Sequence, residues 1–228
     1  MKKQILITLA FLSWALSASA QFMNAPKSSV SVFSDGYTSI WVGYSPTTIK
    51  TPDGHDPDVS FNVDFNTYYL GGLHAFGFNT LPLLVETGAV LEWMHKKDSD
   101  KGEDYSWSSS LDFVGIKVPL NVLYTTQLSN ISLSPYIGIN AKCYVLAKVK
   151  NEGWEEHYNG ERENYSETTD VLNGDDSAMN RFTLGYQFGI RAQYSRFLVS
   201  IGYSADITEI ADENRINKMI TLGVGYAF

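Results

Sequence analysis

The sequence predicts an all-β fold, a transmembrane, up-and-down antiparallel β-barrel of eight strands. Three observations lead to this prediction. Long segments alternate large apolar residues with small or polar ones, which is the side-chain period of a β-strand. The connections between these segments alternate between short turns and long polar loops. The chain also ends on an alternating strand, and closure into a barrel removes the edge that this strand would otherwise expose.

The N-terminal residues have the pattern of a secretory signal peptide. Lys2 and Lys3 precede an apolar run over residues 5–16, and residues 18–20 (ASA) form an A-x-A cleavage site. The run is shorter than the ~20 apolar residues of a membrane anchor helix. Gln21 follows the cleavage site where a lipoprotein would have Cys. We therefore expect a signal peptide (1–20), a periplasmic N-terminal segment (21–37) and a β-barrel domain (38–228).

Composition limits the partners and the chemistry. Cleavage would leave 208 of the 228 residues, enough for one domain, and would change the net charge from −8 to −10 because two lysines are lost. A chain this acidic is not expected to bind nucleic acid. Cys143 is the only cysteine, so no internal disulfide can form, and no metal-ligand spacing surrounds it.

Eight segments are expected to be strands. In chain order they are residues 38–46, 59–78, 83–96, 108–125, 131–150, 180–194, 197–206 and 219–228. Their apolar faces include, in the same order, Ile40 and Val42; Phe61 and Leu70; Leu91 and Trp93; Ile116 and Val118; Ile137 and Ile139; Leu184 and Phe188; Val199 and Ile201; and Leu222 and Val224. Most of these segments exceed the roughly 9–11 residues that a tilted strand needs to cross a bilayer.

The second segment changes phase along its length. Its apolar residues are odd-numbered as far as Phe65 and even-numbered from Tyr68 onwards. Because a one-residue slip moves side chains to the opposite face, we predict a β-bulge near Asn66 and Thr67. The alternative is that the outer part of this segment leaves the barrel wall.

The connections alternate in length. Residues 79–82, 126–130 and 195–196 are short, whereas residues 48–57, 97–107, 151–179 and 207–215 are longer and polar. Short periplasmic turns and long external loops are typical of membrane barrels. A soluble barrel such as a lipocalin has no reason to keep this order and would turn its apolar face inward. Ten strands remain possible if the loop 151–179 folds into a hairpin.

The polar faces of the strands identify the expected lumen. They carry Glu86, Glu92, Lys117, Lys142, Lys148, Arg181, Gln187, Arg191 and Gln193. Eight strands leave room only for side chains, and a buried charge needs a partner. We therefore expect an ionic network of Glu86, Glu92, Lys117, Lys142 and Arg191 that plugs the lumen, helped by Tyr69, Leu73 and Met219. The alternative is a pore in which the charged residues set selectivity.

The terminal strand resembles the C-terminal signature of bacterial outer-membrane β-barrels. That resemblance implies that Tyr226 and Phe228 act as a signal for the barrel-assembly machinery. Residues 81–89 (LPLLVETGA), 114–120 (VGIKVPL) and 134–138 (SPYIG) extend the resemblance to the OmpX-like, or porin-family, outer-membrane proteins. It implies a monomer in the cell outer membrane, in contact with lipid and lipopolysaccharide, with an adhesion, host-surface or small-pore role and no shared catalytic residues.

The loop 151–179 is the main candidate for a binding site, because it carries nine acids and a single base. It could bind an extracellular ligand or divalent cations, or be a solvated surface loop. Residues 173–176 (NGDD) resemble a Ca²⁺ turn but lack the spacing of an EF-hand. His55 lies among three acids in residues 53–58, where turn formation explains the composition equally well. We therefore expect neither a metal nor a cofactor.

Basic residues and a histidine near the second external loop give weaker candidates. Lys96, Lys97 and Lys101 could meet lipopolysaccharide phosphates or the acidic loop. His95 lies near Glu92 and the serines of residues 106–110, but His95 falls on the lipid-facing phase and Glu92 on the lumen phase. A Ser–His–Glu catalytic set is therefore not expected. The expected role is structural or surface interaction through the external loops, followed by a narrow porin-like channel and then a lipid-modifying enzyme.

Overall fold

The computed structural model describes residues 36–52, 60–78, 81–156, 161–172, 179–211 and 214–228. The predicted signal peptide, the loop around His55 and residues 173–176 lie outside the described residues. The strands are β1 (Tyr37–Pro52), β2 (Ser60–Phe78), β3 (Leu81–Lys101), β4 (Tyr105–Tyr124), β5 (Thr126–Leu128), β6 (Ile131–Glu156), β7 (Arg162–Asp170), β8 (Phe182–Tyr194), β9 (Phe197–Asp206) and β10 (Arg215–Ala227).

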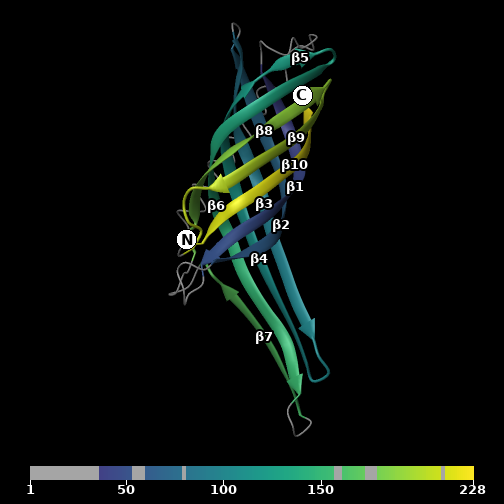
Figure 1. Cartoon of the computed structure of the whole chain (residues 1–228), viewed down its shortest axis with the longest axis vertical. Coiled ribbons are helices and arrows are strands. Elements are labelled where there is room, and N and C mark those ends of the chain that lie inside the picture. Colours follow the sequence, from purple (N-terminus) through teal and green to yellow (C-terminus); the bar gives the residue numbers. More distant parts are fainter. Residues whose placement is uncertain (1–35, 53–59, 79–80, 157–160, 173–178, 212–213) are drawn as a thin grey trace.

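Eight of these strands form a closed antiparallel ring. Their order is β4-β3-β2-β1-β10-β9-β8-β6, and β4 pairs with β6 to close the barrel (Figure 1). The terminal strand β10 pairs with β1 from Ser39↔Ala227 onwards, so the edge at the C-terminus is removed. The short β5 pairs with the start of β6 at one end of the barrel. The predicted fold class is therefore confirmed.

Large apolar side chains point outward along the ring, as predicted. Ile40, Leu70 and Phe182 are 51%, 56% and 72% exposed. Aromatic rings gather at both ends of this outer face. The Tyr44–Tyr68 and Tyr68–Trp93 centroids are 5.5 and 5.8 Å apart near the long-loop end, and Phe197, Tyr226 and Phe228 form a second group near the short turns. An apolar band between two aromatic girdles is the surface of a membrane barrel. Within the described residues, no helix is long and apolar enough to cross a bilayer.

The predicted bulge near Asn66 and Thr67 is wrong. The β1–β2 register runs without a shift from Tyr37↔Ala75 to Pro52↔Ser60. From Phe65 to Ala75 the odd-numbered side chains of β2, including Tyr69, stay inside the barrel. The pattern changes because the lumen itself becomes apolar towards the long loops, while the strand keeps its orientation.

A bulge that the sequence analysis did not predict changes the position of Lys148. Val114 pairs with Leu146 and Gly115 with Tyr144, so Val145 is an extra residue in β6. Tyr144 and Ala147 are therefore both buried, although they are three residues apart. Lys148 is exposed, so the prediction that it lines the lumen is wrong.

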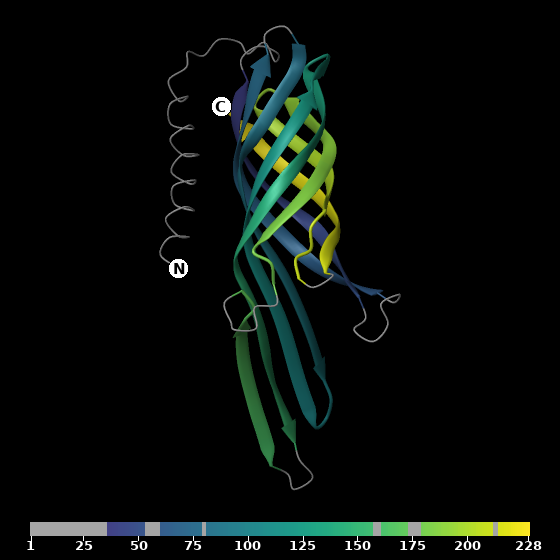
Figure 2. The same cartoon turned by 90° about the vertical axis from the view of Figure 1, so that its left-hand side faces the viewer.

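A four-stranded sheet extends beyond the ring at the long-loop end. Residues 96–101 of β3, 105–112 of β4, 148–156 of β6 and 162–170 of β7 form what we call the protruding sheet. β7 pairs only with β6, so it is an edge strand outside the barrel wall. Figure 2 shows these strands leaving the barrel and extending well past it. The acidic loop therefore folds in part into a hairpin, and the ring still has eight strands.

Candidate functional site: the barrel lumen and the protruding sheet

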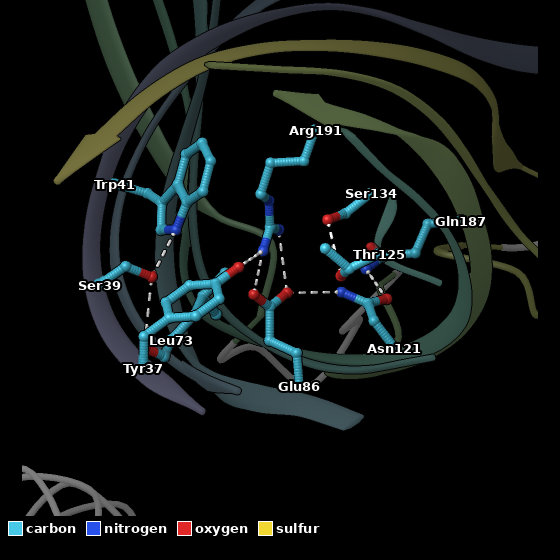
Figure 3. A network of polar contacts seen from close by, with 10 residues as sticks. All are labelled: Tyr37, Ser39, Trp41, Leu73, Glu86, Asn121, Thr125, Ser134, Gln187 and Arg191. Carbon is cyan, nitrogen blue, oxygen red and sulfur yellow. Dashed lines mark hydrogen bonds and ion pairs between the residues drawn. The ribbon is translucent and has the colours of Figure 1, made fainter. Parts of the chain in front are cut away.

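The centre of the lumen holds a buried ion pair between Glu86 and Arg191. Glu86 is 0% exposed and Arg191 is 4% exposed. Arg191 makes a two-pronged contact, in which Nη1 donates to Glu86 Oε2 and Nη2 donates to Glu86 Oε1 at 3.0 Å (Figure 3). β3 supplies the acid and β8 the base, on facing walls of the barrel. A two-pronged pair of this kind fixes orientation as well as charge.

Amides and aromatic rings complete this ion pair. Asn121 donates to Glu86 Oε1 at 3.0 Å, and Gln187 donates to Asn121 at 2.6 Å. On the other side, the Arg191 Nη1 donates to the Tyr37 hydroxyl at 3.0 Å, and its guanidinium carbon lies 4.5 Å from the Trp41 ring centroid. Figure 3 shows Tyr37 and Trp41 on one side of Arg191 and Asn121 with Gln187 on the other. Arg191 is thus enclosed by groups that satisfy its charge.

Two further ion pairs lie nearer to the long loops. Lys117 Nζ contacts Glu92 Oε1, and Lys142 Nζ donates to Asp206 Oδ1 at 2.8 Å. All four residues are at most 8% exposed. The lumen therefore holds three buried pairs with no net charge, which is the arrangement in which buried charges are tolerated.

Apolar side chains close the lumen at both ends. Ala75, Leu84 and Leu123 pack together near the short turns. At the long-loop end a larger cluster, which we call the apolar cap, contains Ile49, Phe65, Met94, Phe113, Tyr144, Ala147, Leu172, Met179, Ile210, Ile216 and Met219. Three of these, Leu172, Met179 and Ile210, come from loop segments that lie beyond the strands. Part of the predicted surface loop therefore seals the barrel.

Between the apolar cap and the ion pairs lies a cavity of about 10 Å³. Glu92, Thr47, Thr67 and Tyr144 contribute polar atoms to its lining, and Met94 and Met219 are among the apolar residues that close it. A cavity of this size holds at most a single water molecule.

The structure buries all five residues predicted for the ionic network in the lumen, where they form separate pairs: Glu86 with Arg191, Glu92 with Lys117, and Lys142 with Asp206. It also buries Tyr69, Leu73 and Met219 in the lumen, as expected. Arg181 is half-buried and donates to the carbonyl of Leu172, and Gln193 donates to the carbonyl of Ser195 in a short turn.

Asp206 is the one member of the three lumen ion pairs that the sequence analysis missed. It is the last residue of the seventh predicted segment, 197–206. It shares its even phase with Ser200, Gly202 and Ser204, which were on the polar face of the same strand. Asp206 is 6% exposed and is the partner of Lys142. Because a buried Lys142 needs an acidic partner, its missing counter-charge and this strand phase together point to Asp206.

The protruding sheet has two faces that continue the two faces of the barrel wall. Phe113 lies in the lumen, and Leu111, Ser109, Trp107 and Tyr105 follow it at alternate positions on β4. We call this side the axis face. The opposite side continues the lipid-facing surface above Trp93, and we call it the membrane face.

The membrane face is stabilised by local ion pairs. Arg162 Nη2 lies 3.3 Å from Glu156 Oε2, and its guanidinium lies 3.9 Å above the Trp154 ring. Lys150 Nζ contacts Glu152 Oε1 at 2.6 Å. This hydrogen bond lowers the pKa of the Glu152 carboxyl below its ordinary value. On the axis face, Tyr105 donates to Asp100 at 2.9 Å, and the carboxylate raises the pKa of the Tyr105 hydroxyl.

His95, Glu92 and Lys96, the weaker candidates near the second external loop, each contact a different partner. His95 Nδ1 lies 2.8 Å from Asp112 Oδ1, and Trp93 donates to the same oxygen at 2.9 Å. Glu92 points into the lumen towards Lys117, away from His95. Lys96 pairs with Asp98 of its own strand at 2.8 Å. In the part of the chain that the structure describes, no group of three His, Cys, Asp or Glu residues could hold a metal ion.

The C-terminal residues proposed as an assembly signal lie on the outer face near the short turns. The Tyr226 and Phe228 ring centroids are 5.3 Å apart, and Phe228 is 66% exposed. The Phe228 amide donates to the Thr38 carbonyl at 2.9 Å, which ties the end of the chain to β1. The recognition of these residues by an assembly machinery stays a prediction.

A closed eight-stranded ring with an apolar outer band, two aromatic girdles and alternating loop lengths identifies the location of this protein. The chain is an integral outer-membrane β-barrel. The location predicted from the sequence is confirmed, and the OmpX-like resemblance holds at the level of the eight-stranded fold. The short turns then face the periplasm and the protruding sheet faces the outside of the cell.

No protein-family model and no curated protein matches this sequence. Among solved structures, the chain is similar to Ail, the attachment invasion locus protein of Yersinia pestis, in complex with the heparin analogue sucrose octasulfate. The identity is 16%, the match covers 85% of this chain and 99% of that one, and the TM-score is 0.43. It is also similar to Neisserial surface protein A, with 11% identity, 84% and 97% covered and a TM-score of 0.40. A third similar structure is the N-terminal β-barrel domain of Pseudomonas aeruginosa OprF, with 11% identity, 85% and 100% covered and a TM-score of 0.32.

Proposed function

We propose that this barrel has a surface-interaction role that is carried by the protruding sheet, and that its lumen is a structural core. The observation that carries the proposal is the contrast between a sealed interior and an exposed exterior. Three ion pairs and three apolar clusters fill the described lumen. The protruding sheet, in contrast, presents a nine-residue edge strand, β7, with every side chain exposed.

The sheet is well suited to contact a partner because its backbone is ordered by long ladders. The β3–β4 pairing continues to Lys101↔Ser106, and the β4–β6 pairing continues to Tyr105↔Glu155. Presenting side chains on a hydrogen-bonded sheet costs less conformational entropy on binding than presenting them on a free loop. We expect lipopolysaccharide and outer-membrane lipid to surround the barrel wall. We also expect the protein to be a monomer.

The test compares two versions of the chain displayed on a heterologous Gram-negative strain. One is the whole chain, and in the other residues 97–105 and 151–170 are each replaced by a short turn. We expect the whole chain to increase adhesion of the cells to immobilised extracellular proteins, and the trimmed chain to lose that gain. Heat-modifiable mobility on gels establishes that both barrels are folded. Equal adhesion of the two strains would contradict the proposal that the protruding sheet carries the interaction.

Conductance of the folded protein in a planar bilayer provides the second arm of the test. We expect no discrete openings, because the cavity beneath the apolar cap has a volume of only about 10 Å³. Reproducible openings would instead favour the porin-like channel, with Glu86, Glu92, Lys117, Lys142 and Arg191 as the residues that set its selectivity.

A further inference from the structure

The two faces of the protruding sheet differ in charge. Residues that pair across neighbouring strands point to the same side of the sheet, so the strand registers assign each side chain to one of the two faces. The axis face has five acids and one base, which are Asp98, Asp100, Glu155, Glu163, Glu167 and Lys96. The membrane face has five bases and four acids, which are Lys97, Lys101, Lys148, Lys150, Arg162, Asp112, Glu152, Glu156 and Asp170. The negative charge is therefore concentrated on the axis face.

The same axis face carries an exposed aromatic surface. Trp107, Gly153 and Tyr165 lie side by side on β4, β6 and β7, and Tyr105 follows Trp107 at the next position on that face. A Cβ atom at position 153 would overlap the Tyr165 hydroxyl, so the Tyr165 ring lies across the glycine. Tyr105, Trp107 and Tyr165 are 42%, 39% and 46% exposed. Large aromatic groups left in water in this way are typical of binding surfaces.

From these two properties we infer that the axis face binds an extended, lysine- or arginine-rich segment of a partner protein. Aromatic faces attract ammonium and guanidinium groups, and the apolar stems of those side chains cover the rings. The surrounding carboxylates supply the complementary charge and steer the encounter. This inference rests on the proposed function, because it names the kind of partner that the protruding sheet would contact.

The spacing of the acids favours a peptide over a metal ion. Same-face neighbours on a strand are about 7 Å apart, so Asp98 and Asp100 are separated by that period. An extended peptide with a basic residue at every second position has the same period. Metal ligands must instead converge within about 2–3 Å of one point, and the described residues contain no such group.

The experiment uses the whole chain in lipid nanodiscs and a fluorescent decapeptide in which Lys and Ser alternate. Binding is followed by fluorescence anisotropy at low and high salt. We expect saturable binding that weakens as salt rises, and no binding of a matched peptide in which Glu replaces Lys. Absence of binding to the lysine peptide would overturn the inference.

Two triple variants separate a binding surface from a general charge effect. Glu155→Gln, Glu163→Gln and Glu167→Gln neutralise the axis face, whereas Glu152→Gln, Glu156→Gln and Asp170→Asn remove the same charge from the membrane face. We expect the axis-face variant to bind roughly tenfold more weakly, since each exposed ion pair contributes roughly a 1.4- to 5-fold gain. The membrane-face variant should change affinity by less than about twofold. Equal losses in both variants would mean that net charge alone is responsible, which overturns the inference.

An aromatic variant tests the second property without altering charge. Trp107→Ser with Tyr165→Ser is expected to weaken binding by roughly three- to tenfold, because an exposed cation–π contact is worth a few-fold each. Unchanged affinity for the peptide would contradict the contribution of the aromatic residues to binding. If the lysine peptide fails to bind while adhesion still depends on the sheet, the inference fails and the proposed function stands. If adhesion is independent of the sheet, the proposed function fails first.

Discussion

The lumen and the protruding sheet contain similar kinds of charged residue but arrange them in opposite ways. In the lumen, three acids and three bases form three ion pairs, and none of these side chains is more than 11% exposed. In the sheet, the side chains of the ion pairs are 23–53% exposed, and acids collect on one face. Burial forces local neutralisation, because an unpaired buried charge is costly. Water removes that requirement, so an exposed face is free to keep a net charge for use in recognition.

Removal of one lumen charge should give the largest effect on stability. Glu86→Ala leaves the Arg191 guanidinium buried without its counter-charge, so we expect a loss of about 3–5 kcal/mol in the free energy of unfolding. Urea titration of the protein refolded into detergent micelles measures this loss. Glu167→Ala in the protruding sheet is the matched control, with an expected change within about 0.5 kcal/mol. Similar losses for both variants would contradict the contrast between the two regions.

The same contrast can be tested with aromatic residues on one face of one strand. Phe113 is 8% exposed in the apolar cap and Trp107 is 39% exposed in the protruding sheet, and both lie on β4 with the same orientation. Phe113→Ala should cost about 3–5 kcal/mol, since it leaves a cavity in a packed cluster. Trp107→Ala should cost less than about 1 kcal/mol. A Phe113→Ala variant as stable as the parent chain would mean that the apolar cap is loosely packed.

Glycines in the barrel wall sharpen the comparison between the inner and outer sides. A Cβ atom at Gly223 would overlap the hydroxyl of Tyr69, which lies against this glycine in the lumen, whereas a Cβ at Gly72 meets only the Ser39 carbonyl at 4.0 Å. We expect Gly223→Ala to destabilise the barrel by about 1–3 kcal/mol through overpacking. Gly72→Ala should be close to neutral or slightly stabilising. Thermal denaturation of the two variants in the same detergent measures their stabilities. A Gly223→Ala variant more stable than Gly72→Ala would contradict the packing described for Tyr69.

The sequence predicts the wall of this barrel better than its ends. Alternation, turn length and the terminal strand identify the ring and the lumen charges, because the bilayer imposes the same pattern on every strand. Phe65 was misread, since an apolar residue on the inner face looks like a change of strand phase. Lys148 was misplaced because nothing in a single strand reveals that Val145 is an extra residue opposite β4. Both errors lie at the long-loop end, where the membrane no longer determines the pattern.

The protruding sheet was the least predictable part for the same reason. Residues 151–170 read as an acidic loop, because exposed strands in water need no apolar alternation. The excess of acids in this segment is visible in the sequence. Their division between two faces is visible only from the pairing of β6 with β7. Asp206 is the opposite case, since its role in the lumen follows from strand phase and from the need of Lys142 for a partner.

The smallest predicted effect concerns a single exposed pair on the membrane face. The hydrogen bond from Lys150 lowers the pKa of Glu152, so the ionised carboxylate is favoured in the folded sheet. A group whose pKa is lower in the folded state adds stability above its unfolded pKa and loses it as the pH falls through the folded pKa. We therefore expect the pKa of the Glu152 carboxyl, followed by NMR, to lie below the ordinary value for a glutamate, and Lys150→Met to raise it towards that value. High salt should have a similar but weaker effect, because this pair lies in water. A Glu152 pKa that is unaffected by Lys150→Met would show that exposed pairs in this sheet have no measurable coupling, and recognition would then depend on the net charge of each face.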